Sequence, residues 1–291
     1  MRLRPRLLPP ELIDYTIDYL HDSPSTLRTC ACVCRAWVAP SRFHLFYHRE
    51  ITPTRTSTVP LRICKLLEFL QGSPHIAFYI REFHFAVGYY GVIQMPDSDW
   101  PQVNAALPHL LGMLTQLRKL VLSGIPFTRL VPDTRAAFRA LFALPCLVDV
   151  EVRYLKVANL EHFTTLLCSP LKRLSVTESP LNEFRSNPED IRAIDKEIKA
   201  VELQERSPCR LEYLHSNNSV FMHWLLGAQT VIDISTIRTL DAYCNPKHME
   251  GLMARLIRRL GPSLENLAIK DPRLDDWGAP FLIYLVTIRF D

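Results

Sequence analysis

The sequence predicts an α/β protein in which a helical N-terminal unit precedes a longer region of alternating strands and helices. Two observations predict this class. Between residues 5 and 51, apolar side chains recur at helical spacing and prolines interrupt the pattern. From residue 61 to the end, a six-residue template of apolar and intervening positions recurs, and segments with helical pattern separate several copies.

The composition excludes several classes of protein. A chain of 291 residues with 48% hydrophobic and 22% charged residues is typical of a folded protein, not a disordered one. The net charge of +4 is small for this length and does not favour nucleic acid or an anionic membrane as a partner. No secretory signal is visible, and the longest apolar run, 281–286, is too short to cross a bilayer. We therefore expect an intracellular protein, cytoplasmic or nuclear, with reduced cysteines.

Three helices are predicted in the N-terminal unit. Pro9 and Pro10 indicate the start of the first, because N–H groups in a first helical turn lack partners anyway. Its apolar face is predicted to contain Leu12, Ile13, Thr16, Ile17 and Leu20. Ser23 and Pro24 predict the start of a second helix. Residues 39–51 form a third amphipathic stretch.

The second predicted helix contains three cysteines at alternate positions, Cys30, Cys32 and Cys34. Helical residues two apart point in different directions, so the three thiols cannot converge on one metal ion. On a helical wheel Cys30 and Cys34 share the side of Leu27 and Trp37, whereas Cys32 lies on the other side. The pattern therefore predicts buried thiols at 30 and 34 and no metal or redox site.

These residues resemble the F-box family in the order of several residue types. The family's opening Leu-Pro-x-Glu-Leu/Ile is matched by Leu8, Pro9, Glu11 and Leu12, and its later Ile and Leu by Ile17 and Leu20. Its Leu…Cys…Val-Cys-Arg-x-Trp is matched by Leu27, Cys30, Val33, Cys34, Arg35 and Trp37. The resemblance covers about a sixth of the chain and identifies residues 5–51 as an F-box-like helical domain.

The resemblance implies that this domain docks to the Skp adaptor of a cullin-based ubiquitin ligase. The adaptor-binding residues that it implies are Leu8, Pro9, Glu11, Leu12, Ile17, Leu20, Leu27, Val33, Cys34 and Trp37. Packing inside a small helical unit is the alternative role for each of them. The polar stretch at 52–60, rich in Thr, Ser and Pro, is predicted to be a linker.

The region 61–291 contains an irregular internal repeat. The template L-x-x-L-x-L starts at Ile80, Leu117, Leu147, Leu171, Leu211, Ile237, Leu264 and Leu285. Helical patterns occupy 133–144, 159–169, 188–205 and 246–261 between copies. A strand followed by a helix, repeated, is typical of a leucine-rich-repeat solenoid with parallel strands. We therefore predict an irregular, leucine-rich-repeat-like α/β domain.

The intervening positions of the template test this prediction, because the template search leaves them less constrained than the apolar positions. Among 24 such positions only Ala86, Val121 and Ala268 are apolar, as expected for strands with one face in water. In a solenoid these side chains point to the concave surface. The predicted target-binding residues on that surface are Lys119, Asp149, Glu151, Arg153, Arg173, Tyr213, His215, Asp241, Tyr243 and Lys270.

No established catalytic motif occurs. The sequence lacks G-x-G-x-x-G, phosphate-loop, G-x-S-x-G, H-E-x-x-H and paired C-x-x-C patterns, so we predict a non-enzymatic protein without cofactor or metal. The resemblance implies a ubiquitin-ligase substrate receptor whose partners are the Skp adaptor, a cullin through it, and an unidentified protein target.

Other interpretations remain open. A repeat scaffold without ligase coupling is the main alternative, and a hydrolase with an unrecognised site is a further one. Mixed charge signs on the predicted concave surface count against a nucleic-acid partner. Arg255, Arg258 and Arg259 on one predicted helix are interpreted as a solvated flank, with binding of an acidic partner as the alternative.

Overall fold

The computed structural model describes residues 9–54, 58–89, 93–155, 163, 167, 171–177, 209–227, 232–243, 246–270 and 284–286. It begins with three helices, α1 (Pro10–Tyr19), α2 (Pro24–Cys30) and α3 (Arg35–Tyr47). The predicted starts of the first two helices are confirmed. Their small core consists of Ile13, Ile17, Leu27 and Cys30, with the half-buried Leu20, Trp37 and Leu45 packed against it.

The prediction of one helix through the three cysteines is wrong. α2 ends at Cys30, residues 31–33 form a turn, and Cys34 is the N-cap of α3 in an extended conformation. Cys30 is buried as predicted, whereas Cys34 is exposed like Cys32. The wheel failed because the apolar residues after position 31 belong to a new helix that returns to pack on α2.

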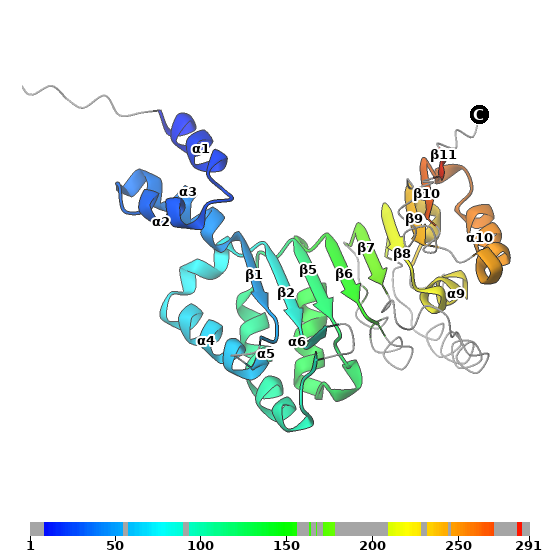
Figure 1. Cartoon of the computed structure of the whole chain (residues 1–291), viewed down its shortest axis with the longest axis horizontal. Helices are drawn as coiled ribbons and strands as arrows, with labels where there is room; N and C mark the ends of the chain where they lie inside the picture. The colour runs from blue at the N-terminus through cyan, green and yellow to red at the C-terminus, as the bar shows by residue number, and fades with distance from the viewer. Residues whose placement is uncertain are drawn as a thin grey trace, which may run out of the picture.

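In the described part of the chain, eight parallel strands form the centre of the molecule (Figure 1). In spatial order they are β1 (His48–Ile51), β2 (Glu82–Ala86), β5 (Lys119–Ser123), β6 (Asp149–Arg153), β7 (Arg173–Thr177), β8 (Tyr213–Ser216), β9 (Thr239–Tyr243) and β10 (Asn266–Lys270). Their spatial order is also their order along the chain. Beside them, β3 (Gly88–Tyr89) and β4 (Ile93–Gln94) form a small antiparallel pair.

Seven of the eight template copies coincide with strands of this parallel sheet, each strand starting two residues after its copy. The eighth copy, at Leu285, is an exception: β11 (Tyr284–Val286) pairs antiparallel with β10, so the prediction of a parallel strand there is wrong. Conversely, β1 lies within the range predicted as helical and pairs with β2. The sheet therefore extends into residues that the sequence assigned to the N-terminal unit.

The helices after the N-terminal unit cover one face of the sheet (Figure 1). They are α4 (Val59–Gly72), α5 (Trp100–Met113), α6 (Pro132–Phe142), α9 (Ser219–Gly227) and α10 (Pro246–Leu260). Short 3₁₀ turns are η1 (Pro74–Tyr79), η2 (Asp97–Asp99), η3 (Phe127–Arg129), η6 (Ile234–Thr236) and η7 (Gly261–Ser263). The predicted helices at 133–144 and 246–261 are confirmed as α6 and α10, whereas 159–169 and 188–205 lie outside the described residues, apart from Phe163 and Leu167.

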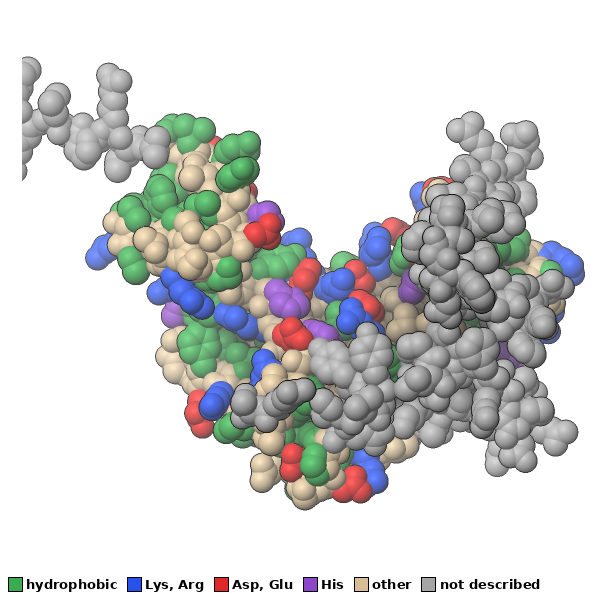
Figure 2. Space-filling model, viewed as in Figure 1, with side chains coloured by type: hydrophobic (Ala, Val, Ile, Leu, Met, Phe, Trp, Pro, Cys, Tyr) green, Lys and Arg blue, Asp and Glu red, His purple; other side chains and the backbone are tan. Residues whose placement is uncertain are grey.

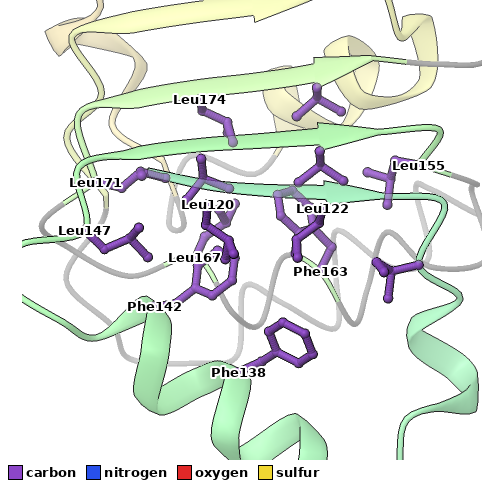
Figure 3. Packing of buried hydrophobic residues seen from close by; sticks show 14 of the residues in the cluster. Leu120, Leu122, Phe138, Phe142, Leu147, Leu155, Phe163, Leu167, Leu171 and Leu174 are labelled. Carbon is purple, nitrogen blue, oxygen red and sulfur yellow. The ribbon is translucent and has the colours of Figure 1, made fainter. Parts of the chain in front are cut away.

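A single large core lies between the sheet and these helices. In the part shown in Figure 3, Leu120 and Leu122 of β5 point toward Phe138 and Phe142 of α6. The ring centroid of Phe127 lies 6.4 Å from that of Phe138. Because alternate residues of a strand point to opposite faces, burying one row directs the intervening row to the other face.

The N-terminal unit is joined closely to the sheet. α3 continues directly into β1, and Phe46 of α3 stacks on Phe69 of α4 with 5.7 Å between ring centroids. The guanidinium of Arg62 in α4 donates hydrogen bonds to the backbone oxygens of Thr52 (2.5 Å) and Glu50 (3.3 Å). Within the predicted linker at 52–60, Thr52 is thus held against α4, which itself begins at Val59.

Candidate functional site

The open face of the sheet carries rows of polar side chains that follow the strand register. The first row runs across five neighbouring strands through His48, Glu82, Lys119, Asp149 and Arg173, which alternate between basic and acidic residues. His48 Nδ1 lies 3.5 Å from Glu82 Oε2, and Arg173 Nε lies 3.5 Å from Asp149 Oδ2. This row is therefore compensated internally by cross-strand pairs.

The same row continues through an aromatic contact. The guanidinium carbon of Arg173 lies 4.3 Å from the centroid of the Tyr213 ring on the next strand. A cation over an aromatic face is attracted by about 0.5–1 kcal/mol at an exposed site. Arg173 is thus oriented by Asp149 on one side and Tyr213 on the other.

A second row contains two pairs of histidine and carboxylate. Glu50 Oε1 lies 3.5 Å from His84 Nδ1, and His215 Nδ1 lies 3.2 Å from Asp241 Oδ2. Between them Glu151 accepts a hydrogen bond of 2.6 Å from Arg153 Nε. Figure 2 shows acidic, basic and histidine side chains together over the sheet, in the hollow beside the N-terminal helices.

The structure brings most predicted target-binding residues together on this face. Arg173 is exposed, and the half-buried members are Lys119, Asp149, Glu151, Arg153, Tyr213, His215 and Asp241. Tyr243 and Lys270 belong to β9 and β10, but their side chains lie outside the described residues. The prediction missed His48 and Glu50, because a four-residue strand gives too short an alternation to be recognised; the only signal was two polar residues alternating before Ile51.

One row invites comparison with a serine hydrolase. Ser175, His215 and Asp241 are register neighbours on β7, β8 and β9, the residue types of a catalytic triad. The contact established within this row is that of His215 Nδ1 with Asp241 Oδ2 at 3.2 Å, so the row contains a histidine–carboxylate pair beside a half-buried serine.

Burial changes the protonation of two groups on this face. Burial raises the pKa of Asp149 above its usual range, while Lys119 and Arg173 act in the opposite direction. Burial lowers the pKa of His84, and Glu50 opposes this effect. The Nε2 atom of His84 is buried and has no hydrogen-bond partner among the described residues, which agrees with a neutral ring.

The lowered pKa of His84 predicts a dependence of stability on pH. The unfolded chain binds a proton at the ordinary value, about 6.5, and the folded chain only at a lower pH. The free energy of unfolding should therefore fall as the pH decreases from about 7.5 through 6.5 toward the folded value. In the His84→Gln variant this fall should be smaller, as measured by urea unfolding at about pH 7.5 and about pH 5.5.

His75→Gln provides the control, because His75 is an exposed histidine in η1. Its variant should keep the pH dependence of the wild type. An equally steep fall in the His84→Gln variant would show that His84 does not cause it.

A second candidate surface is an apolar stripe on the N-terminal helices. Leu12, Tyr15 and Tyr19 lie on one side of α1 and are 52%, 74% and 83% exposed. Val33, in the turn before α3, is 60% exposed. Exposed apolar side chains at this density are typical of interaction sites. We refer to these four residues as the apolar stripe; Figure 2 shows hydrophobic side chains gathered on this unit.

The predicted adaptor-binding residues separate into three groups in the structure. Pro9, Glu11, Leu12, Val33 and Cys34 are exposed, Leu20 and Trp37 are half-buried, and Ile17 and Leu27 are buried. Leu8 lies outside the described residues. Ile17 and Leu27 have almost no accessible surface, so they support the helices and cannot contact a partner directly. The prediction missed Tyr15 and Tyr19, whose signal was their spacing of three and seven residues from Leu12.

A polar contact holds α1 in place under the apolar stripe. His44 of α3 and Asp18 of α1 are joined through Nε2 and Oδ1 at 2.7 Å. Together with the small core beneath α1, this contact fixes the side that carries Leu12 toward the solvent.

Comparison with protein-family models and with curated proteins finds no match to this chain. Among the described residues, no helix is both long and apolar enough to span a membrane. The same residues contain no group of three or more His, Cys, Asp or Glu side chains placed to share a metal ion.

Proposed function

We propose that this chain is the substrate-recognition subunit of a Skp–cullin–F-box ubiquitin ligase. In this proposal α1–α3 form an F-box that docks to the Skp adaptor, and the polar face of the sheet holds a protein target. The observation that supports it most is the apolar stripe, because Leu12 and Val33 are exposed at positions that match the F-box pattern.

The energetics of the N-terminal unit favour a partner. Among its described residues the core contains four buried side chains, which is small for three helices, while large apolar side chains face water. Burying apolar surface stabilises by about 25 cal/mol per Å². A partner that covers the stripe would therefore bind favourably and stabilise the folded unit at the same time.

We further propose that the sheet and its helices form an irregular leucine-rich-repeat-like solenoid. In support, each parallel strand lies beside the next one in the chain, and the helices between strands lie on one face. Among the described residues, such an arrangement places the polar rows of successive strands side by side on the other face. The cross-strand pairs on that face keep its charged groups oriented before a target binds, which lowers the entropic cost of binding.

Catalysis would then require no reacting side chain from this chain. The receptor holds a target lysine near the ubiquitin-charged enzyme and raises their effective concentration. The geometry that matters is the fixed relation between α1–α3 and the sheet, and the direct continuation of α3 into β1 provides it.

Calorimetry with a purified Skp adaptor tests the proposal. The wild-type chain should bind the adaptor. A variant carrying Leu12→Ala and Val33→Ala should bind about tenfold more weakly, which is a loss of about 1.4 kcal/mol in binding free energy. Leu61→Ala is the matched control, since Leu61 is an exposed leucine on α4, away from the stripe. It should bind like the wild type.

Absence of binding by a folded wild-type chain would contradict the receptor proposal. Equal affinity of the wild type and the variant carrying Leu12→Ala and Val33→Ala would contradict the proposed docking surface. Either result would favour a repeat scaffold without ligase coupling.

A further inference from the structure

A separate pocket lies between α9 and α10 and is lined by three arginines. Its volume is about 300 Å³, and the described residues that line it are Leu226 of α9 and Arg255, Arg258 and Arg259 of α10. The arginines are three and four residues apart, so they project from the same side of the helix. Arg259 donates a hydrogen bond through Nη1 to the backbone oxygen of Leu226, which anchors its guanidinium at the pocket wall.

Two of the arginines in this pocket, Arg255 and Arg258, are not paired with a carboxylate in the described part of the chain. Both side chains are exposed. Like charges three or four residues apart on a helix repel each other. Arg258 and Arg259 lie in the last turn of α10, where the helix dipole favours cations. Arg255 lies about one turn earlier, so the helix dipole stabilises its charge less than those of Arg258 and Arg259.

The chemistry of the pocket defines the class of ligand. Guanidinium groups match the geometry of phosphate oxygens and bind them through charge-assisted hydrogen bonds. A phosphoryl group carries a charge of about −1.5 to −2 at neutral pH and three acceptor oxygens, and so matches the two unpaired guanidinium groups of Arg255 and Arg258 better than a single carboxylate does. Leu226 adds an apolar wall against which an organic stem could pack.

We propose that the pocket of Leu226, Arg255, Arg258 and Arg259 binds a phosphoryl group, carried by a small phosphate compound or by a phosphorylated side chain. This site is distinct from the polar face of the sheet. The buried residues of α9 and α10, including Trp224 and Leu256, pack in the core with the inward residues of β9 and β10, such as Leu240 and Leu267. The pocket therefore belongs to the helical side of the molecule, and a ligand there would leave the polar face free.

Titration of the full chain with three probes tests the proposal: inorganic phosphate, phenyl phosphate and phenol, at constant ionic strength. Affinity is measured by calorimetry, and the site is located by the NMR shift of the Leu226 amide. Both phosphate probes should bind saturably and shift that amide, whereas phenol should not. The Arg255→Gln/Arg258→Gln variant should bind about tenfold more weakly. Both arginines are exposed, so circular dichroism should show a folded variant.

Arg139→Gln is the matched control, because Arg139 is an exposed arginine in the last turn of α6. This variant should bind the phosphate probes like the wild type. Tighter binding of phenyl phosphate than of inorganic phosphate would support a phosphorylated side chain as the ligand, and equal affinity would support a small phosphate compound. No saturable binding, unchanged affinity in the double variant, or an equal loss in the Arg139→Gln variant would overturn the proposal.

Discussion

Replacing Ile17 by alanine is expected to unfold α1–α3 while the sheet stays folded. Ile17 has no accessible surface and belongs to a small core in which four of the described residues are buried. Truncating a buried isoleucine to alanine costs about 2–5 kcal/mol, a large part of what so small a unit contributes. Hydrogen exchange should therefore become fast in α1–α3 and remain slow in β5 and β6.

Leu12→Ala separates stability from docking in this experiment. Leu12 is exposed on the same helix, so its variant should keep the slow exchange of α1 while it weakens adaptor binding. If the Ile17→Ala variant kept the slow exchange of α1–α3, the small core would contribute less than the structure indicates. If exchange rose equally throughout the sheet, the two cores would unfold as one unit.

Phe138→Ala is expected to have the largest effect on the sheet. Phe138 of α6 is fully buried and faces β5 (Figure 3). Its ring centroid lies 6.4 Å from that of Phe127. Truncation of a buried phenylalanine costs about 3–5 kcal/mol through lost burial and the cavity that remains. Urea unfolding, followed by the circular dichroism of the sheet and its helices, should show this loss as a lower midpoint with an unchanged slope.

Phe78→Ala is the control for this variant, because Phe78 in η1 is largely exposed. The free energy of unfolding of this variant should lie within about 0.5 kcal/mol of that of the wild type. A Phe138→Ala variant as stable as the Phe78→Ala variant would contradict the packing of α6 on the sheet.

The strands of the repeat region were predictable because burial imposes a strong pattern on them. Most strands of the sheet place apolar residues at alternate positions with polar residues between them, as Val150 and Val152 of β6 do on either side of Glu151. Repetition of the template made seven strands recognisable, although several copies depart from it. α6 and α10 were also predictable, since each has one apolar face of several turns.

The elements that escaped prediction depend on tertiary contacts. β1 has four residues and gains its strand character by pairing with β2. The antiparallel direction of β11 depends on how the chain returns to β10, which no local pattern encodes. The turn at 31–33 joins two short helices whose apolar residues together imitate one helix, so Cys34 was placed in a core that it does not enter.

The candidate site was predictable as a surface but not as a set of contacts. Alternation identified which side chains, such as Asp149 and Arg173, share the open face. Their pairing depends on strand register, and the burial that shifts the pKa of His84 depends on neighbours distant in sequence. On the N-terminal helices, the family pattern marked Leu12 and Val33, while the exposed Tyr15 and Tyr19 lie outside it.

The most direct test of the proposed receptor function is hydrogen exchange of the full chain with and without the Skp adaptor. The account predicts slower exchange in α1 and in the turn at 31–33, with unchanged exchange in β6 and β7 on the polar face. Unchanged exchange in α1 at saturating adaptor, or slowing confined to the sheet, would contradict it.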